Sequence, residues 1–153
     1  MLNNLNVGSV IKWSNFPYPH HGNERKSRWF IYIGKTGIFT NPICMYLCTT
    51  TTSLDDFKKG GKRESHLRVF FKSKSSPFDE NCLLDIDEKP YPFEEVRIFH
   101  NSDIEYKGDL EENKLREIYN KICKSNSYSF IVKKDIHKSL NSIGITGLKR
   151  PKR

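Results

Sequence analysis

Short segments of alternating or continuous hydrophobic residues recur along the chain up to residue 99, and this pattern predicts β-strands. Residues 9–13 alternate and are rich in β-branched side chains, and a Pro-containing loop follows them. Residues 28–33 form a nearly continuous apolar run, which is typical of a strand covered on both faces. Similar patterns predict further strands at residues 43–49, 66–72, 82–86 and 94–99.

The periodicity changes to that of a helix after residue 108. Asp109 and Glu112 have the spacing of an N-terminal capping box. Four apolar residues then recur at i, i+3, i+4 and i+7, as on one face of a helix: Leu115, Ile118, Tyr119 and Ile122. A shorter helix is predicted at residues 134–143, and residues 147–153 are expected to be disordered.

Five or six short strands followed by helices predict a mainly β fold with helices, of the α+β class. We expect either a small SH3-like barrel or a strongly bent antiparallel sheet, with a helix packed on it near the C-terminus. The length of 153 residues supports one ordinary domain. We place that domain at residues 1–123 and assign residues 124–153 to a basic C-terminal extension, made of a short helix and a disordered tail.

The formal net charge of +8 is unevenly distributed along the chain. Residues 1–75 hold 12 basic and 4 acidic side chains, residues 76–132 hold 7 and 13, and residues 133–153 hold 7 and 1. A basic first half and a basic tail around an acidic middle favour a surface that meets a polyanion. A lysine-rich, solvated surface explains the same counts.

The sequence also indicates the compartment. No apolar run approaches the ~20 residues needed to cross a bilayer, and the N-terminus has neither a cationic start nor an apolar stretch. We therefore expect a cytoplasmic protein that makes no use of a membrane. Its four cysteines form no CxxC pair, so we expect reduced, structural thiols: Cys44, Cys48, Cys82 and Cys123.

Motifs for several enzyme classes are missing from the sequence: it has no phosphate-binding loop, dinucleotide motif, zinc-protease motif or hydrolase elbow. Asp85 and Asp87 share one face of a predicted strand and can in principle hold a metal, but their place in the acidic middle favours a solvated face. The adjacent His20 and His21 point in different directions and rarely share a metal. We predict no metal site and no cofactor.

Polar side chains are concentrated where two predicted strands begin and end. Residues 24–28 enter the second strand, and residues 49–53, which are mostly threonine, leave the third. An arginine suits a phosphate as a bidentate partner, and hydroxyl groups donate to phosphate oxygens. If the fold brings the two segments together, a scissile phosphate fits between them. The alternative is that Arg28 is a surface cation and the threonines are ordinary β-formers.

The same segments resemble the MazF/PemK/Kid family of toxin endoribonucleases. The family's motifs are matched in order by Gly8-Ser9-Val10-Ile11-Lys12-Trp13 with Phe16-Pro17, by Lys26 to Ile33, by Leu47 to Ser53, and by Tyr106 to Leu110 with the helix after it. The chain departs from the family at Trp29, where proline is usual, and lacks the proline before the threonine run. Residues 124–153 have no counterpart in compact members of the family.

The resemblance implies a sequence-specific, metal-independent endoribonuclease in which the 2′-hydroxyl of single-stranded RNA attacks the adjacent phosphate. Arg28 is then expected to stabilise the charge of the transition state, and Thr50, or Thr51 next to it, is the expected catalytic hydroxyl. The residues expected to bind RNA are Trp13, Phe16, His21, Arg25 and Lys26. The resemblance also implies a homodimer and an acidic antitoxin as the partner of a toxin-antitoxin system.

Two other functions fit the same sequence. One is a noncatalytic SH3-like module that binds nucleic acid or a protein, since basic and aromatic residues serve either purpose. The other is a toxin of the same fold that inhibits a protein target such as gyrase, for which Arg28 and Thr50 are dispensable.

Overall fold

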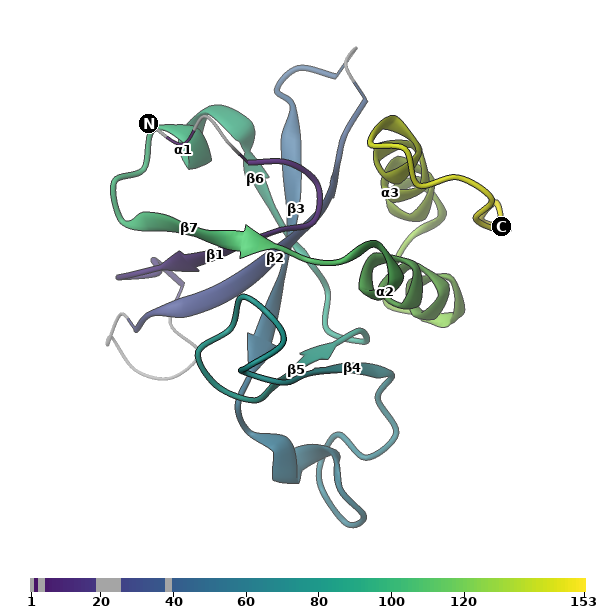
Figure 1. The fold of residues 1–153 in the computed structure, drawn as a ribbon. Coiled ribbons are helices and arrows are strands. Elements are labelled where there is room, and N and C mark those ends of the chain that lie inside the picture. Colours follow the sequence, from purple (N-terminus) through teal and green to yellow (C-terminus); the bar gives the residue numbers. More distant parts are fainter. Residues whose placement is uncertain (1, 3–4, 19–25, 38–39) are drawn as a thin grey trace.

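A computed structural model describes residues 2, 5–18, 26–37 and 40–153 (Figure 1). It confirms the predicted α+β class, with strands first and the two longer helices near the C-terminus. In chain order the elements are β1 (Ser9–Trp13), β2 (Arg28–Lys35), β3 (Cys44–Thr51), the 3₁₀ helix η1 (Leu54–Phe57), β4 (Arg68–Phe71), β5 (Cys82–Asp85), β6 (Tyr91–Glu94), α1 (Glu95–Phe99), β7 (Ile104–Asp109), α2 (Glu112–Lys124) and α3 (Phe130–Ser142).

The strands form one antiparallel sheet, which contains seven strands over the described residues. Its order is β4-β5-β3-β2-β1-β7. The long strand β3 has two partners on one side, because its first half pairs with β6 and its last two residues pair with β5. The sheet is open, with β4 and β7 at its edges. Of the two forms predicted, the structure therefore has an antiparallel sheet and no closed barrel.

The last predicted strand, residues 94–99, is wrong. Glu94 ends β6, and residues 95–99 form the short helix α1, in which Ile98 is buried and Val96 is 60% exposed. A short apolar run does not distinguish a strand from a helix by its periodicity. Conversely, β7 was not predicted as a strand because only Ile104 of its six residues is buried. Polar residues on an edge strand are common, since one side of it faces water.

Helix α2 buries the four residues of the predicted apolar stripe. The capping box before it is wrong, because the carboxylate of Asp109 has other partners: it accepts hydrogen bonds from Ser9 Oγ at 2.8 Å and from Tyr106 Oη at 2.8 Å. The helix begins at Glu112 after Glu111, whose side chain makes no capping bond. Tertiary contacts thus outcompete the local cap at this position.

Helix α3 begins four residues before the predicted start. Ser129 caps it, since its Oγ accepts a hydrogen bond from the N–H of Val132 at 3.2 Å. The helix packs closely on β2 at Gly34, where an added Cβ would lie 3.0 Å from the Cα of Ile136. Glycine at this position is therefore what allows the helix axis to approach the sheet.

The C-terminal segment also differs from the prediction of a separate extension with a disordered tail. Residues 143–153 lie against α2 and α3, and Ile145 is 3% exposed. Arg116 of α2 donates from Nη1 to the carbonyl of Thr146 at 2.8 Å, and Tyr119 donates to the carbonyl of Lys149. Residue 123, where the sequence analysis placed the domain boundary, lies inside α2, and four buried residues after it belong to the same hydrophobic cluster as the sheet: Tyr128, Ile136, Leu140 and Ile145.

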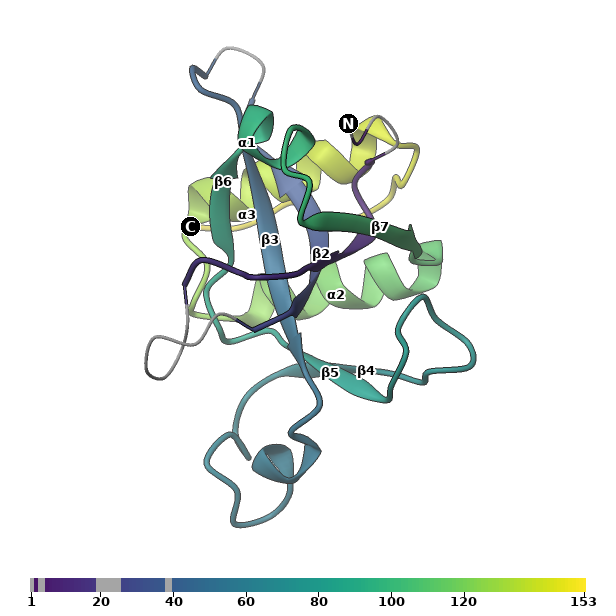
Figure 2. The same cartoon turned by 90° about the vertical axis from the view of Figure 1, so that its left-hand side faces the viewer.

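The two longer helices lie side by side on one face of the sheet, and they stand behind it in Figure 2. The opposite face is filled by packed aromatic rings whose centroids lie 4.9–6.1 Å apart: Trp13, Phe16, Phe30 and Phe93. Among the described residues, no helix is both long enough and apolar enough to span a membrane.

Candidate functional site

Antiparallel pairing brings the start of β2 and the end of β3 to the same end of the sheet. A hollow of about 600 Å³ lies there. It is lined by residues from β1, from the start of β2 and the segment before it, from the end of β3 and the segment after it, and from the start of β5 and the loop before it: Lys12, Lys26, Ser27, Arg28, Trp29, Thr50, Thr51, Thr52, Ser53, Phe78, Asp79, Glu80 and Cys82. Four of the predicted site residues, Lys26, Arg28, Thr50 and Thr51, therefore lie around one space.

The register of the sheet distinguishes the two candidate threonines by the face on which each lies. Phe30 of β2 pairs with Thr49 of β3. Successive side chains of a strand point to opposite faces of a sheet. Arg28 lies two residues before Phe30, and Thr51 lies two residues after Thr49, so both side chains lie on the same face as that pair. Thr50 lies on the opposite face. Of the two candidates, Thr51 is therefore the one that shares a face with Arg28.

Thr50 has a different neighbour. Burial raises the pKa of the Cys82 thiol to about 12, and a hydrogen bond with the Thr50 side chain offsets part of that rise. A thiol with so high a pKa stays protonated at neutral pH and is a poor nucleophile. The Cys82 thiol and the Thr50 side chain line the hollow, and the thiol is not expected to react there.

Arg28 lies between the hollow and the aromatic face of the sheet. Its guanidinium carbon is 6.0 Å from the centre of the Phe16 ring. Burial raises the pKa of the Tyr91 hydroxyl, and the nearby charge of Arg28 lowers it in part. Stacking on a ring fixes an arginine while leaving its N–H groups available to a ligand.

The loop between β4 and β5 forms the other wall of the hollow. Phe78 is 4% exposed, and its ring packs 5.7 Å from the ring of Trp29 and 5.1 Å from that of Phe71. Asn81 accepts a hydrogen bond from the N–H of Ser73 at 3.1 Å. Phe78 and Asn81 flank residues 79–80, so these contacts hold the loop on both sides of them. The carboxylates of Asp79 and Glu80 line the hollow.

Two of the predicted RNA-binding residues are not available to a base. Trp13 is 3% exposed and Phe16 is 1% exposed, because both rings pack into the aromatic cluster. Base stacking needs an open ring face, and neither ring offers one in this structure, so their assignment to RNA binding stays a prediction that the burial does not support. Tyr18, which is 49% exposed, is the neighbouring ring that reaches solvent. The predicted contacts at His21 and Arg25 lie outside the described residues.

From the sequence position of Asp85 and Asp87 we expected a solvated face, but in the structure Asp85 is buried and Asp87 is half-buried. Asp85 is 2% exposed and contacts His66 Nδ1 at 2.9 Å and Arg63 Nη1 at 3.2 Å. Asp87 accepts hydrogen bonds from the N–H of Leu67 at 2.8 Å and from Ser125 Oγ at 2.6 Å. Both carboxylates therefore hold the segment before β4 and the loop after α2 against β5.

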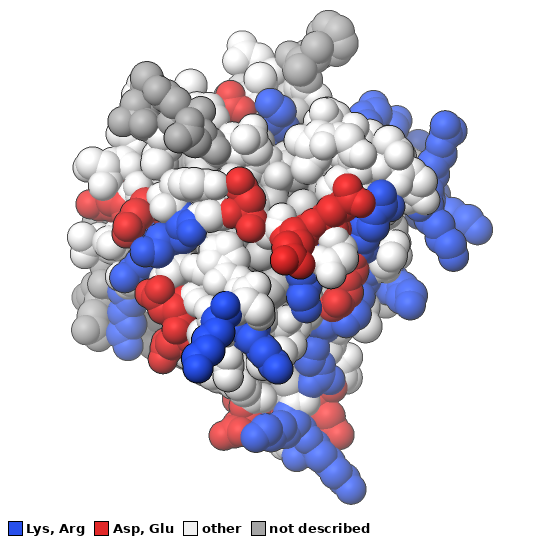
Figure 3. All heavy atoms as spheres, viewed as in Figure 1, with Lys and Arg blue, Asp and Glu red and all other residues white. Residues whose placement is uncertain are grey.

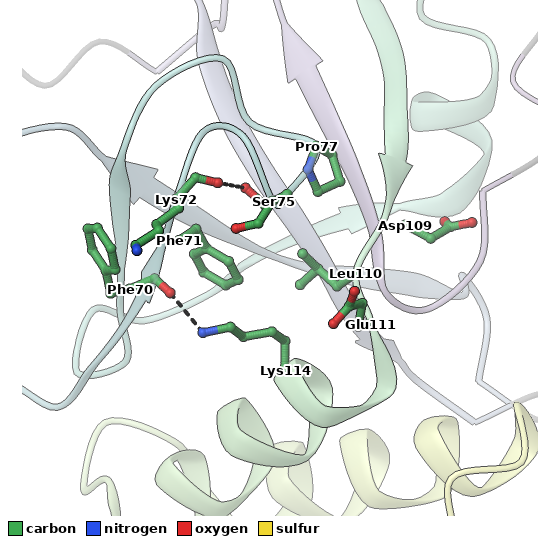
Figure 4. Close-up of a pocket in the computed structure, with 10 residues that line it drawn as sticks. Phe70, Phe71, Lys72, Ser75, Pro77, Asp109, Leu110, Glu111 and Lys114 are labelled. Carbon is green, nitrogen blue, oxygen red and sulfur yellow. Dashed lines mark hydrogen bonds between the residues drawn. The ribbon is translucent and has the colours of Figure 1, made fainter.

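A smaller hollow of about 270 Å³ lies between β4 and the start of α2 (Figure 4). Its lining is largely apolar, with Phe70, Phe71 and Leu110 around it. Lys114 reaches across from α2 and donates to the carbonyl of Phe70 at 2.9 Å. Lys121 does the same at the carbonyl of Arg68, so the helix covers the outer edge of β4.

In the folded chain, acidic and basic residues that are separated along the sequence lie next to one another on parts of the surface. Figure 3 shows acidic and basic side chains interspersed across the middle of one face and at the loop after β3, and Lys and Arg gathered over the C-terminal segment. Lys12, Asp79 and Glu80 line the larger hollow but were not predicted as site residues. No local motif marks them, because Lys12 belongs to an ordinary strand and the two acids to a linker.

Comparisons with family models, with curated proteins and with solved structures find no match to this chain.

Proposed function

We propose that this protein is an endoribonuclease toxin that cleaves single-stranded RNA in the hollow at the ends of β2 and β3. The observation that carries the proposal is the grouping of three cations with a row of hydroxyl groups around one space: Lys12, Lys26 and Arg28 with Thr50, Thr51, Thr52 and Ser53. Fixed cations and hydroxyl donors are what a phosphodiester needs at close range. The resemblance of these segments to the MazF/PemK/Kid family supports the same function.

The proposed reaction needs no metal ion. The 2′-oxygen of one ribose attacks the adjacent phosphorus, the bond from phosphorus to the 5′-oxygen of the next nucleotide breaks, and a 2′,3′-cyclic phosphate and a 5′-hydroxyl remain. Arg28 stabilises the extra negative charge on the phosphoryl oxygens, and Thr51, on its face of the sheet, donates a hydrogen bond to one of them. Lys12 and Lys26 hold the neighbouring phosphates.

The proposal extends to partners. A toxin of this kind acts as a homodimer in the cytoplasm and is neutralised by an acidic antitoxin that covers the basic hollow. Opposite charge on the two proteins would speed their association and favour the correct pairing.

The deciding experiment incubates the purified protein with single-stranded RNA in EDTA. Cleavage should persist, and the products should carry a 5′-hydroxyl that polynucleotide kinase labels directly. RNA bound without cleavage would favour the noncatalytic module. Inhibition of DNA supercoiling by gyrase, with the RNA left intact, would favour a toxin that acts on a protein target.

A further inference from the structure

We propose that Lys12 and Lys107 form a phosphate-binding subsite for single-stranded RNA beside the scissile phosphate, and that Trp29 is the residue that positions their two ammonium groups. This inference rests on the proposed function. It adds Lys107 and Trp29 to the phosphate contact assigned to Lys12 above, and it states where the RNA backbone runs beyond Arg28.

The register of three strands brings these side chains to one face of the sheet. Lys12 of β1 pairs with Trp29 of β2 on one side and with Glu105 of β7 on the other. Paired residues lie on the same face of a sheet, so Trp29, Lys12 and Glu105 form a row across the strands. The ammonium nitrogen of Lys12 lies 6.0 Å from the centre of the Trp29 ring.

A β-bulge directs Lys107 to the same ring. The register of β1 against β7 shifts between Val10 and Ile11, which leaves Lys107 without a partner on β1. Bulges bend a strand and change the direction of a side chain, often beside functional sites. The next residue, Gly108, has a φ of +135°, which L side chains rarely adopt, so glycine permits the bulge here. The Lys107 ammonium nitrogen reaches across β1 and lies 5.4 Å from the centre of the Trp29 ring on β2.

The two lysines are not fully compensated by carboxylates. Among the described residues, Lys12 has no hydrogen-bonding or ion-pair partner, although it is half-buried. Lys107 lies 3.4 Å from a carboxylate oxygen of Glu105, whose side chain is 65% exposed. Asp79 and Glu80 also line the hollow, but in the described part of the chain neither forms an ion pair with these lysines. One positive charge of the pair is therefore left for an anionic ligand.

Trp29 holds the two cations in place. A cation within about 6 Å of the centre of an indole ring is attracted to the negative face of the ring, and tryptophan gives the strongest contact of this kind. The ring is itself fixed, because it packs 5.7 Å from the ring of Phe78, which is 4% exposed. Since an indole ring accepts no ordinary hydrogen bond, this contact leaves the ammonium N–H groups available to phosphate oxygens.

The subsite adjoins the proposed cleavage site. Lys12 and Trp29 line the hollow together with Arg28. Arg28 and Trp29 are the first two residues of β2, so their side chains leave the strand on opposite faces. A single strand of RNA bound at Arg28 therefore reaches the face of Trp29 by passing around the end of β2. Contacts to backbone phosphates read no sequence, so this subsite strengthens binding and fixes the path of the RNA.

The test measures binding apart from cleavage. The probe is a single-stranded RNA oligonucleotide with 2′-O-methyl groups, which lacks the attacking 2′-hydroxyl. We expect Lys107→Gln to weaken binding and to reduce the slope of log K against log salt by roughly 0.7, the value for one phosphate contact on a single strand. Glu105→Gln should tighten binding, because it removes the carboxylate that competes with phosphate for Lys107.

Lys35→Gln is the matched control for Lys107→Gln. Lys35 also belongs to the sheet and lies beside a carboxylate, that of Glu95 at 3.7 Å, but it is at the other end of β2 from the hollow. The salt slope of this variant should equal that of the wild type.

Two substitutions of Trp29 test its positioning role. Trp29→Leu keeps an apolar side chain against Phe78 but removes the ring face, and it should reduce the salt slope at least as much as Lys107→Gln does. Trp29→Phe keeps a ring and should restore most of the slope. Adding Lys107→Gln to Trp29→Leu should reduce the slope no further, since both changes remove the same contact. A Trp29→Leu variant with the slope of the wild type would overturn the positioning role.

Cleavage of unmodified RNA keeps this inference distinct from the proposed function. Lys107→Gln should raise KM and leave kcat nearly unchanged, because a contact to a phosphate that does not react is the same in the ground state and in the transition state. If the wild type cleaves RNA and Lys107→Gln binds the probe with the slope of the wild type, the subsite is wrong and the proposed function stands. If the variants change the slope as expected but the wild type leaves unmodified RNA intact, the subsite stands and the cleavage is wrong. A wild type that does not bind the probe overturns both.

Discussion

Nδ1 of His66 lies 2.9 Å from Oδ2 of Asp85, a carboxylate whose side chain is 1% exposed. Arg63 meets the same oxygen at 3.2 Å, and the N–H of Asp87 donates to the other oxygen at 3.0 Å. One buried group thus ties the long segment between η1 and β4 to β5. The Asp85 carboxylate therefore fixes how the segment between η1 and β4 lies against β5.

Replacing Asp85 by alanine should destabilise the fold by about 3 kcal/mol. Removing one partner of a buried ion pair costs about 3–5 kcal/mol, and the lower end applies because Arg63 and His66 are 26% and 35% exposed. Urea denaturation gives the value. The control is Asp55→Ala, whose side chain is 90% exposed beside Lys58 and should change stability by less than about 0.5 kcal/mol. Equal stability of the two variants would show that Asp85 is no anchor.

Arg28→Ala should lower the RNA cleavage rate ~10²–10³-fold, the usual cost of removing one preorganised charge stabiliser. The fold should remain, because Arg28 is half-buried at a strand end and contributes charge rather than packing. Arg97→Ala is a suitable control, since Arg97 also lies 6.0 Å from an aromatic ring, that of Phe93, but does not line the hollow. Purified, folded Arg28→Ala with the cleavage rate of the wild type would remove Arg28 from the site.

Two truncations should separate the structural part of the C-terminal segment from its charged end. Deleting residues 145–153 removes Ile145, which is 3% exposed, and should cost about 2–5 kcal/mol, as expected for a large apolar side chain. Deleting residues 150–153 removes three cations from exposed positions and should leave stability nearly unchanged. The shorter deletion should reduce the slope of log K against log salt for single-stranded RNA by about 2, at roughly 0.7 per phosphate contact. An unchanged slope would assign these cations to solubility.

The thiols should differ in reactivity according to burial. Burial raises the pKa of Cys48 to about 12 and that of Cys82 to about 12. Iodoacetamide at pH 8, followed by peptide mass mapping, should therefore modify the half-buried Cys44 and Cys123 first. Equal rates at all four sites would contradict the burial of Cys48 and Cys82.

The same two thiols should make the fold sensitive to alkali. Between the ordinary thiol pKa of 9.0 and the folded-state value of about 12, the unfolded chain releases protons that the folded chain keeps. Their contribution to stability is complete below pH 9 and is lost as the pH rises toward 12. Urea midpoints at pH 8 and pH 10 should fall less in Cys48→Ala/Cys82→Ala than in the wild type. An equal fall in both proteins would show that other groups cause it.

The resemblance leads us to expect a dimer at micromolar concentration. Large apolar side chains reach solvent at several places on the monomer, including Phe70, Val96 and Ile131, which are 40%, 60% and 69% exposed. A second copy can cover such surface. Light scattering during gel filtration should give twice the chain mass of 17.9 kDa. A single-chain mass would count against the homodimer and leave the hollow as a site within one protomer.

The sequence by itself determined the elements whose periodicity is strong. The alternation of Ser9 to Trp13 and the stripe from Leu115 to Ile122 each specify one buried face, and the structure has β1 and α2 there. It also identified Arg28 and the threonine run as polar groups at the ends of strands. These are local properties, because a strand or helix shows its buried face in the spacing of its own residues.

Tertiary structure decided what depends on partners far away in the chain. The register of β2 against β3 put Thr51 on the face of Arg28, and packing hid Phe16 from any base. The side chain of Asp109 accepts a hydrogen bond from Ser9, 100 residues away, and therefore does not cap α2. Ile145 is buried, although its local sequence, rich in Gly and basic residues, did not indicate burial. Such outcomes follow from contacts between distant segments, whose free energy no local pattern contains.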